Sequence, residues 1–132
     1  MYEQIIARVE GTLKTLGIEP AEAKTSDGQY NISKQKDIEL LIDVWEENNK
    51  VFFQVMSLLY SVTDTMEKDR FKMLLEENHT LVEASFALIN NQIFIKEIIE
   101  CSVFFNQERV LSSITRIAYY CEIYKAKWAT EF

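Results

Sequence analysis

The chain is poor in several residue types that mark disorder, disulfide scaffolds and catalysis. Its 132 residues contain one proline, three glycines, two cysteines and one histidine. Because proline and glycine are scarce while 48% of the residues are hydrophobic, the composition excludes a low-complexity or disordered chain. A chain of this length can bury one hydrophobic core, so we predict a single domain, 1–132, without a linker or an internal repeat.

Long apolar runs and basic clusters are absent as well. Charged residues interrupt every apolar stretch and no basic, apolar leader follows Met1, so we expect neither a transmembrane helix nor a secretory signal. A cytoplasmic location follows, where Cys101 and Cys121 are expected to be reduced thiols. The net charge of −7 repels phosphate backbones, so we predict no nucleic-acid or membrane binding; such a charge suits a basic or apolar partner.

No group of residues has the spacing of a metal site, a cofactor motif or a catalytic centre. His79, the single histidine, lies far along the chain from Cys101, whereas zinc sites require several ligands at short, characteristic spacings. Glycine-rich nucleotide-binding motifs are missing too. We therefore predict no metal, no cofactor and no enzymatic activity. The alternative is an enzyme that uses His79 together with Glu76 or Glu77.

The hydrophobic periodicity changes along the chain in the order αβββαββα. Apolar residues recur every three or four positions over 2–16, which predicts a helix that ends at Gly17. The ranges 37–46 and 51–62 alternate like strands and flank an asparagine-rich hairpin turn. Between the helix and these strands, the range 21–33 is polar and is predicted as one irregular edge strand.

The second half of the chain predicts a helix, a hairpin and a longer helix. Asp64 and Glu67 form a capping-box-like pair that begins the first of these helices, which ends near Asn78. All the elements together predict an α+β fold, in which an antiparallel sheet is packed by an N-terminal and a long C-terminal helix. The remaining elements are strands at 82–89 and 92–100, the turn Asn90-Asn91, and a last helix capped by Asn106.

The chain has more apolar residues than one side of such a sheet requires. The strand 51–62 is apolar on both faces, whereas an antiparallel sheet usually keeps one polar face, and the last helix carries two apolar stripes. Either helices cover both faces of the sheet or a second protein covers one of them. We therefore predict a protein-contact surface for a homodimer or another partner. The residues expected to form it are Phe52, Met56, Tyr60, Tyr120, Tyr124 and Trp128.

The segment around the middle helix resembles a known fold. Phe71-Lys72-Met73-Leu74-Leu75-Glu76-Glu77-Asn78 ends in Leu-Leu-x-x-Asn and precedes the small-aromatic-x-leucine strand Ala84-Ser85-Phe86-Ala87-Leu88 and a hairpin, Asn90-Asn91 with Ile93-Phe94-Ile95. This pattern is similar to the type III secretion chaperone-like fold, which includes the class I secretion chaperones and the stand-alone YbjN-like family. The resemblance implies a strongly twisted antiparallel sheet with helices packed on it, in a protein that dimerises.

The resemblance also implies a function. Secretion chaperones hold an extended segment of a secreted effector against apolar patches, so the expected function is that of a small, acidic, non-enzymatic, protein-binding domain that acts as a homodimer and holds a polypeptide partner. The polar range 21–33 departs from these chaperones, whose first strand helps to form the client groove, and favours the YbjN-like branch. The alternative is a small-ligand-binding or regulatory domain with an apolar pocket between the sheet and the C-terminal helix.

Overall fold

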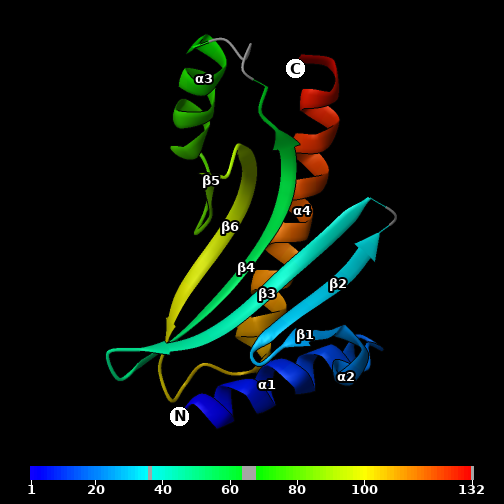
Figure 1. Cartoon of the computed structure of the whole chain (residues 1–132), viewed down its shortest axis with the longest axis vertical. Coiled ribbons are helices and arrows are strands. Elements are labelled where there is room, and N and C mark those ends of the chain that lie inside the picture. Colours follow the sequence, from blue (N-terminus) through cyan, green and yellow to red (C-terminus); the bar gives the residue numbers. More distant parts are fainter. Residues whose placement is uncertain (36, 64–67, 132) are drawn as a thin grey trace.

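The computed structural model in Figure 1 describes residues 1–35, 37–63 and 68–131. The predicted α+β fold, an antiparallel sheet with a helix at each end of the chain, is confirmed. The predicted capping pair Asp64 and Glu67 lies outside the described residues. The helices are α1 (Tyr2–Thr15), α2 (Pro20–Ala23), α3 (Lys68–Asn78) and α4 (Gln107–Glu131), and the strands are β1 (Lys24–Ser26), β2 (Gln29–Gln35), β3 (Ile38–Glu47), β4 (Lys50–Ser61), β5 (Ser85–Ile89) and β6 (Gln92–Cys101).

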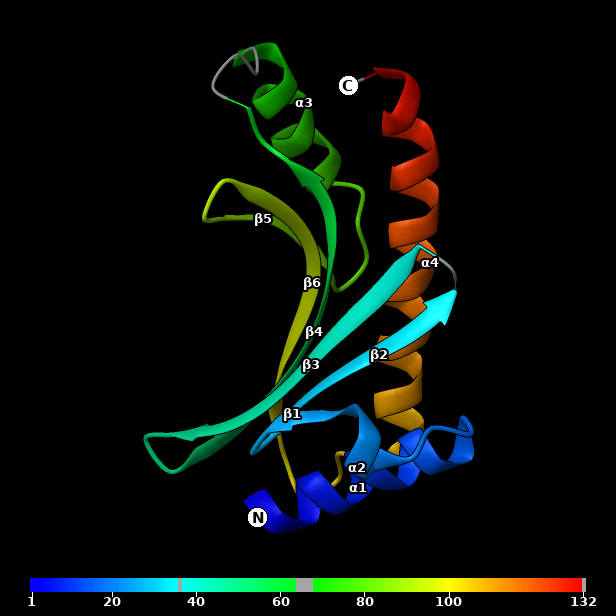
Figure 2. The ribbon, with the colours of Figure 1, turned by 45° about the vertical axis from the view of Figure 1, so that its right-hand side comes forward.

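Within the described ranges, the strands form one six-stranded antiparallel sheet in the order β1-β2-β3-β4-β6-β5. The 12-residue β4 pairs with β3 on one side and with β6 on the other. The chain passes through α3 before it returns as β5 and β6, so β5 forms the outer edge of the sheet. In Figure 2, the β3–β4 and β5–β6 hairpins both curve toward the side that faces away from α4.

The long helix α4 crosses the sheet on one face, where it packs on β3, β4 and β6 and against α1. The guanidinium of Arg8, on α1, joins α1 to the loop before α4 by donating hydrogen bonds to the carbonyl oxygens of Val103 (3.1 Å) and Phe105 (2.8 Å). The core lies between these helices and the sheet. Its fully buried side chains include Ile5, Val9, Leu13, Leu40, Phe53, Val55, Ile95, Ile114 and Ile117.

Asparagines form the two hairpin turns, as the sequence predicts. Asn48 and Asn49 have φ angles of 53° and 65°, and Asn90 and Asn91 have φ angles of 50° and 61°. These left-handed conformations match the right-handed twist of the flanking strands, and asparagine adopts them at low cost. The predicted cap of the last helix is also confirmed, because Asn106 Oδ1 accepts a hydrogen bond from the N–H of Arg109 over 3.0 Å.

The range 21–33 differs from its prediction, since it holds the one-turn helix α2 and a hairpin of two strands instead of one irregular strand. The register shifts between Lys24 and Ser26, and a strand of three residues is too short to show alternation. β5 also begins at Ser85 rather than at residue 82, because Glu83 adopts a φ of 55°, which is incompatible with a regular strand.

Candidate functional site

The two faces of the central strands have different surroundings. Along β4, Val51, Phe53 and Val55 are buried against α4, and Ser57 Oγ lies 3.1 Å from Cys121 Sγ of that helix. The alternate side chains point to the opposite face because strand side chains alternate. On that face none of the described helices covers the sheet, which Figure 2 shows from the side.

The strand register gathers apolar side chains on this uncovered face. Trp45 pairs with Phe52, and their rings stack with centroids 5.5 Å apart. Met56 lies beside Leu41 on β3, and Leu58 lies beside Phe94 on β6. Directly opposite residues share a face, so these side chains lie on one surface. The polar pair Asp43 and Gln54 stands between the Trp45–Phe52 pair and the Leu41–Met56 pair. We call this surface the uncovered band: Leu41, Trp45, Phe52, Met56, Leu58, Phe94 and Ile98. Ile98 is 50% exposed and Leu58 37%, Phe94 is only 7% exposed, and the other four are half-buried.

One carboxylate lies at the edge of the uncovered band. Asp43 pairs with Gln54 in the register, between the rows of Trp45 and Leu41. Burial raises the pKa of the Asp43 carboxyl, and a hydrogen bond from Gln29 lowers it by less. Among the residues that the structure describes, Asp43 forms no ion pair. On the β6 side of the band, Lys96 Nζ donates to Gln54 Oε1 over 3.5 Å.

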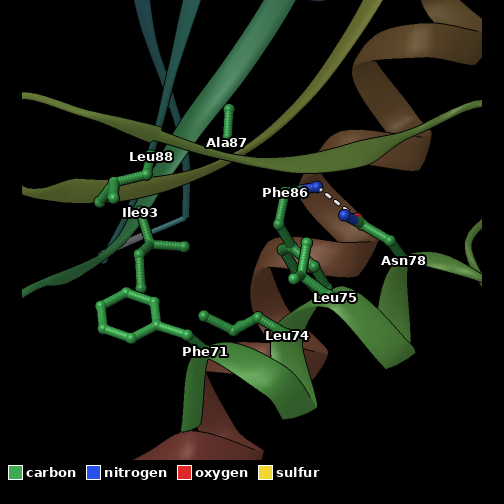
Figure 3. A pocket seen from close by; sticks show the side chains of 8 residues that line it. All are labelled: Phe71, Leu74, Leu75, Asn78, Phe86, Ala87, Leu88 and Ile93. Atoms are coloured by element: carbon green, nitrogen blue, oxygen red, sulfur yellow. Dashed lines mark hydrogen bonds between the residues drawn. The ribbon is translucent and has the colours of Figure 1, made fainter. Parts of the chain in front are cut away.

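A small apolar pocket lies between α3 and the β5–β6 hairpin (Figure 3). Its volume is about 200 Å³. Asn78 closes one side, where its Oδ1 accepts a hydrogen bond from the N–H of Phe86 over 2.7 Å. The predicted position between the sheet and α4 is instead filled by buried side chains such as Ile114 and Ile117. The pocket is lined by Phe71, Leu74, Leu75, Asn78, Phe86, Ala87, Leu88 and Ile93.

Exposed apolar side chains surround the mouth of this pocket. Leu75 is 72% exposed and Leu88 is 56% exposed, and Ile89 is exposed at the end of the same strand. β5 pairs with β6 only, so its other edge carries backbone groups without a neighbouring strand among the described residues. We call Leu75, Leu88, Ile89 and the pocket the α3–β5 surface.

The C-terminal part of α4 supports this surface from beneath. Tyr124 Oη donates a hydrogen bond to Glu77 of α3 over 3.0 Å, and Lys127 pairs with the same carboxylate at 3.2 Å. The Phe86 ring packs edge-on against Tyr124, with centroids 5.0 Å apart, and contacts Trp128 at 5.2 Å. Burial and the hydrogen bond to Glu77 raise the pKa of Tyr124 to about 12.

The six predicted contact residues do not form one surface. Phe52 and Met56 come together on the uncovered band. The register shift after Leu58 pairs Tyr60 with Ile93, so Tyr60 lies half-buried on the helix-covered side. The other three belong to α4: Tyr120 is half-buried and accepts a hydrogen bond from the N–H of Val82 over 3.0 Å, while Tyr124 and Trp128 are 7% and 2% exposed.

Several residues of both surfaces were missed by the sequence reasoning. Trp45 and Leu41 carry a signal, because a short hairpin turn at 47–50 sets Trp45 opposite Phe52 and Leu41 opposite Met56. The local sequence gives no signal for Ile98, Leu75 and Leu88, since their neighbours in the fold come from distant segments of the chain.

A buried ionic cluster joins β6 to α4. Glu97, only 2% exposed, accepts hydrogen bonds from Ser113 Oγ (2.8 Å) and from Arg116 (2.6 Å), and Arg109 lies 3.3 Å away. On the exposed side of the cluster, the Glu83 carboxylate lies 2.8 Å from the guanidinium of Arg109 and 3.5 Å from that of Arg116. The carboxylates and guanidiniums neutralise one another, so this cluster holds the loop before β5 against α4.

The other residues weighed as chemical groups are dispersed. His79 is exposed beyond the end of α3, and Cys101 and Cys121 are free, buried thiols. No three histidine, cysteine or acidic side chains gather as metal ligands in the part of the chain that the structure describes. Over the same residues, no helix combines the length and the apolarity that crossing a membrane requires.

Comparison with known proteins gives a likeness of fold. No protein-family model matches the chain, and no curated protein matches its sequence. A chain of the heterodimeric ExoU–SpcU complex from the type III secretion system of Pseudomonas aeruginosa matches with a TM-score of 0.66 and 12% identity, over 89% of this chain and 94% of that one. A chain of the HopA1–SchA chaperone–effector complex matches with a TM-score of 0.69 and 8% identity, over 92% and 93%. A chain of the ExsC–ExsE complex matches with a TM-score of 0.69 and 10% identity, over 96% and 94%.

These identities are low, so the likeness concerns the fold. The chain has the type III secretion chaperone-like fold that the pattern from Phe71 to Ile95 predicts.

Proposed function

We propose that this chain is a non-enzymatic, cytoplasmic, polypeptide-binding domain of secretion-chaperone-like type that acts as a homodimer. The uncovered band carries this proposal. A sheet face that carries Trp45, Phe52 and Met56, with none of the described helices upon it, has unfavourable contact with water, which a bound polypeptide removes. The similar fold of a chain in the HopA1–SchA chaperone–effector complex supports the same function.

In this proposal, the six predicted contact residues divide into two roles. Phe52 and Met56 contact the polypeptide directly, together with Trp45. The four remaining residues act behind the α3–β5 surface, where Tyr124 and Trp128 support Phe86 and where Tyr60 and Tyr120 pack beside them. The choice between the YbjN-like branch and the secretion chaperones stays a prediction.

Polypeptide binding is tested with a permanently unfolded, carboxymethylated protein that carries a fluorescent label. We expect native protein to raise the anisotropy of the label and Phe52→Glu to abolish this rise, because a carboxylate in the band opposes apolar contact. Thr115→Glu, on the exposed side of α4, is the matched control and should bind like the native protein. Equal binding by Phe52→Glu and Thr115→Glu would contradict the proposal.

The α3–β5 surface is the proposed homodimer contact. An interface about a two-fold axis brings the same patch of both copies together. Leu75 and Leu88 of each copy then cover the pocket of the other copy. The free edge of β5 lies beside the β5 edge of the second copy. The pocket volume of about 200 Å³ suits one inserted side chain. It lies below the roughly 300–1,000 Å³ of small-molecule sites, so this pocket is small for a ligand of that kind.

Size-exclusion chromatography with light scattering tests the dimer. We expect a dimer at tens of micromolar, roughly the range in which modest interfaces saturate. Leu88→Glu should give a monomer, whereas Ile98→Glu, an equally exposed position on the uncovered band, should leave the dimer intact. A native protein that stays monomeric at this concentration would exclude the homodimer. A thermal-shift screen with small apolar compounds tests the ligand alternative, because native-state ligands raise the melting temperature.

A further inference from the structure

We propose that the occupant of the uncovered band is an amphipathic helix with a lysine or arginine at one flank, and that this basic side chain pairs with Asp43. The inference rests on the proposed function and names the class of polypeptide that the uncovered band binds. It goes beyond an extended client, because the geometry of the face and its charge both select a helix of a particular kind.

The backbone of the occupant decides between a helix and an extended segment. The band lies on the face of the sheet, where side chains point outward and the backbone groups of β3, β4 and β6 are already paired with one another. An extended segment lying flat on this face would place its own N–H and C=O groups over Phe52 and Met56 without partners. A helix satisfies these groups internally and presents only side chains.

The dimensions of the band agree with a helix. From Phe52 to Leu58 the strand advances six residues, or about 20 Å, and the distance from β3 across β4 to β6 is about 10 Å. A helix with side chains is about 10 Å wide, and about 13 residues span 20 Å. The occupant is therefore a helix of about four turns, which lies on the face opposite α4.

The charge of the face selects the polar flank of this helix. Lys50 already pairs with Glu100 at 3.1 Å, and Lys96 is bonded to Gln54. Asp43 stands beside Gln54 on the β3 side, without an ion pair among the described residues. Its partial burial raises the cost of its charge, so a cation that reaches it gains more than at an open surface.

A second copy of this chain is a poor occupant of the same band. Each copy carries a net charge of −7, and two copies that meet on this face bring both Asp43 carboxylates toward each other. A basic amphipathic helix from another polypeptide meets no such repulsion. The net charge of the whole chain also attracts it over longer distances.

The test uses three labelled 14-residue peptides. The first is an amphipathic helix with leucines on one face and lysine at one flank. The second replaces the lysine by glutamine, and the third is the first with one central polar residue replaced by a proline, which breaks the helix. Affinities are measured by anisotropy, and the fluorescence of Trp45 reports contact because Trp128 is buried. Each peptide is titrated against native protein, Asp43→Asn and Asp27→Asn.

We expect the lysine helix to bind native protein about tenfold more tightly than the glutamine helix and to quench Trp45, a difference in the range of one charged hydrogen bond. Asp43→Asn should remove this preference. Asp27→Asn, which removes the same charge from the exposed β1–β2 turn, should keep it. The proline peptide should bind at least about tenfold more weakly than its helical twin, because it cannot satisfy its backbone over the band.

Three results overturn the inference. Equal binding of the helical and proline peptides excludes a helix and leaves the proposed function standing. An equal loss of preference in Asp43→Asn and Asp27→Asn assigns the effect to net charge alone. A homodimer that Met56→Glu dissociates would place a second copy on the band. If neither these peptides nor the unfolded carboxymethylated protein binds, the proposed function itself fails.

Discussion

The carboxylate of Glu97, on β6, accepts a hydrogen bond of 2.6 Å from the guanidinium of Arg116, on α4, within the interface between sheet and helix. Ser113 donates to the other oxygen of the same carboxylate. Because removing one partner leaves the other charge partly buried and unpaired, we expect Glu97→Ala to lower the free energy of unfolding by about 3 kcal/mol. Urea unfolding followed by circular dichroism measures this difference.

Glu83 provides the comparison for that prediction, because it touches the same two arginines from the exposed side of the cluster. We expect Glu83→Ala to cost at most about 1 kcal/mol, since solvent screens its ion pairs. Two variants of similar stability would show that the position of Glu97 beneath α4 contributes nothing.

The two glycines with positive φ angles have different requirements. Gly28 has a φ of +73°, and a Cβ there would lie 2.4 Å from the Val44 carbonyl oxygen and 2.6 Å from Tyr2 Oη. Gly17 has a φ of +79° but meets nothing within 4 Å. Alanine at either position pays about 1 kcal/mol to adopt the left-handed conformation. Because its Cβ also clashes, we expect Gly28→Ala to lower the free energy of unfolding by at least about 2 kcal/mol in total. Thermal unfolding of both variants checks the order, and the reverse order would contradict the packing at Gly28.

The contact between α3 and α4 depends on pH through Glu77. Burial alone would raise the pKa of this carboxyl, but hydrogen bonds from Tyr124 and Lys127 outweigh it and lower the pKa below the ordinary 4.5. A lowered pKa means that the ionised group stabilises the fold above pH 4.5 and that this contribution disappears as the pH falls through the folded-state pKa. We therefore expect the stability lost in Glu77→Gln to be larger at about pH 7 than at about pH 3. An unchanged difference between the two conditions would show that the ionised form of Glu77 is not favoured.

The cysteines are predicted to be inert in the folded chain. Burial raises the pKa of the Cys101 thiol to about 11, and it also raises that of Cys121, which Ser57 lowers by a smaller amount. Because the thiolate is the reactive form, a thiol reagent at neutral pH should label neither residue until urea unfolds the protein. Val103→Cys, at an exposed loop position, is the control and should be labelled at once. Rapid labelling of native Cys101 would mean that the end of β6 opens easily.

Local chemistry made the turns and caps predictable from sequence. Asn48-Asn49 and Asn90-Asn91 are short polar pairs between alternating apolar runs, and asparagine is among the few residues that adopt left-handed backbone cheaply. Asn106 lies before an apolar helical pattern and supplies its own side-chain cap. In each case the residues that determine the structure are neighbours in sequence.

The pairing of distant strands could not be predicted in the same way. Strict alternation along the strand 51–62 predicts that Tyr60 lies on the same side as Phe52, because it puts even-numbered residues together. The shift between Leu58 and Tyr60 reverses that order, and it depends on β6, which lies more than thirty residues away in sequence. Similarly, Trp128 is covered by Phe86, and no local pattern connects β5 with the end of α4.

The candidate surfaces were therefore predictable in kind but not in position. An excess of apolar side chains on the strand 51–62 indicated an uncovered face, and Phe52 and Met56 lie on it. The α3–β5 surface escaped prediction because its exposed leucines, Leu75 and Leu88, belong to elements with otherwise ordinary apolar patterns.

The packing of α1 on α4 has a consequence for synthesis of the protein. Ile5, Val9 and Leu13 are synthesised well before α4, the helix that α1 packs against. At usual translation rates the delay is on the order of ten seconds. During that time the nascent chain exposes the apolar stripe of α1 and the open edge of β4, until β6 and α4 emerge. Assistance by chaperones should therefore matter more during translation than during refolding of the full chain.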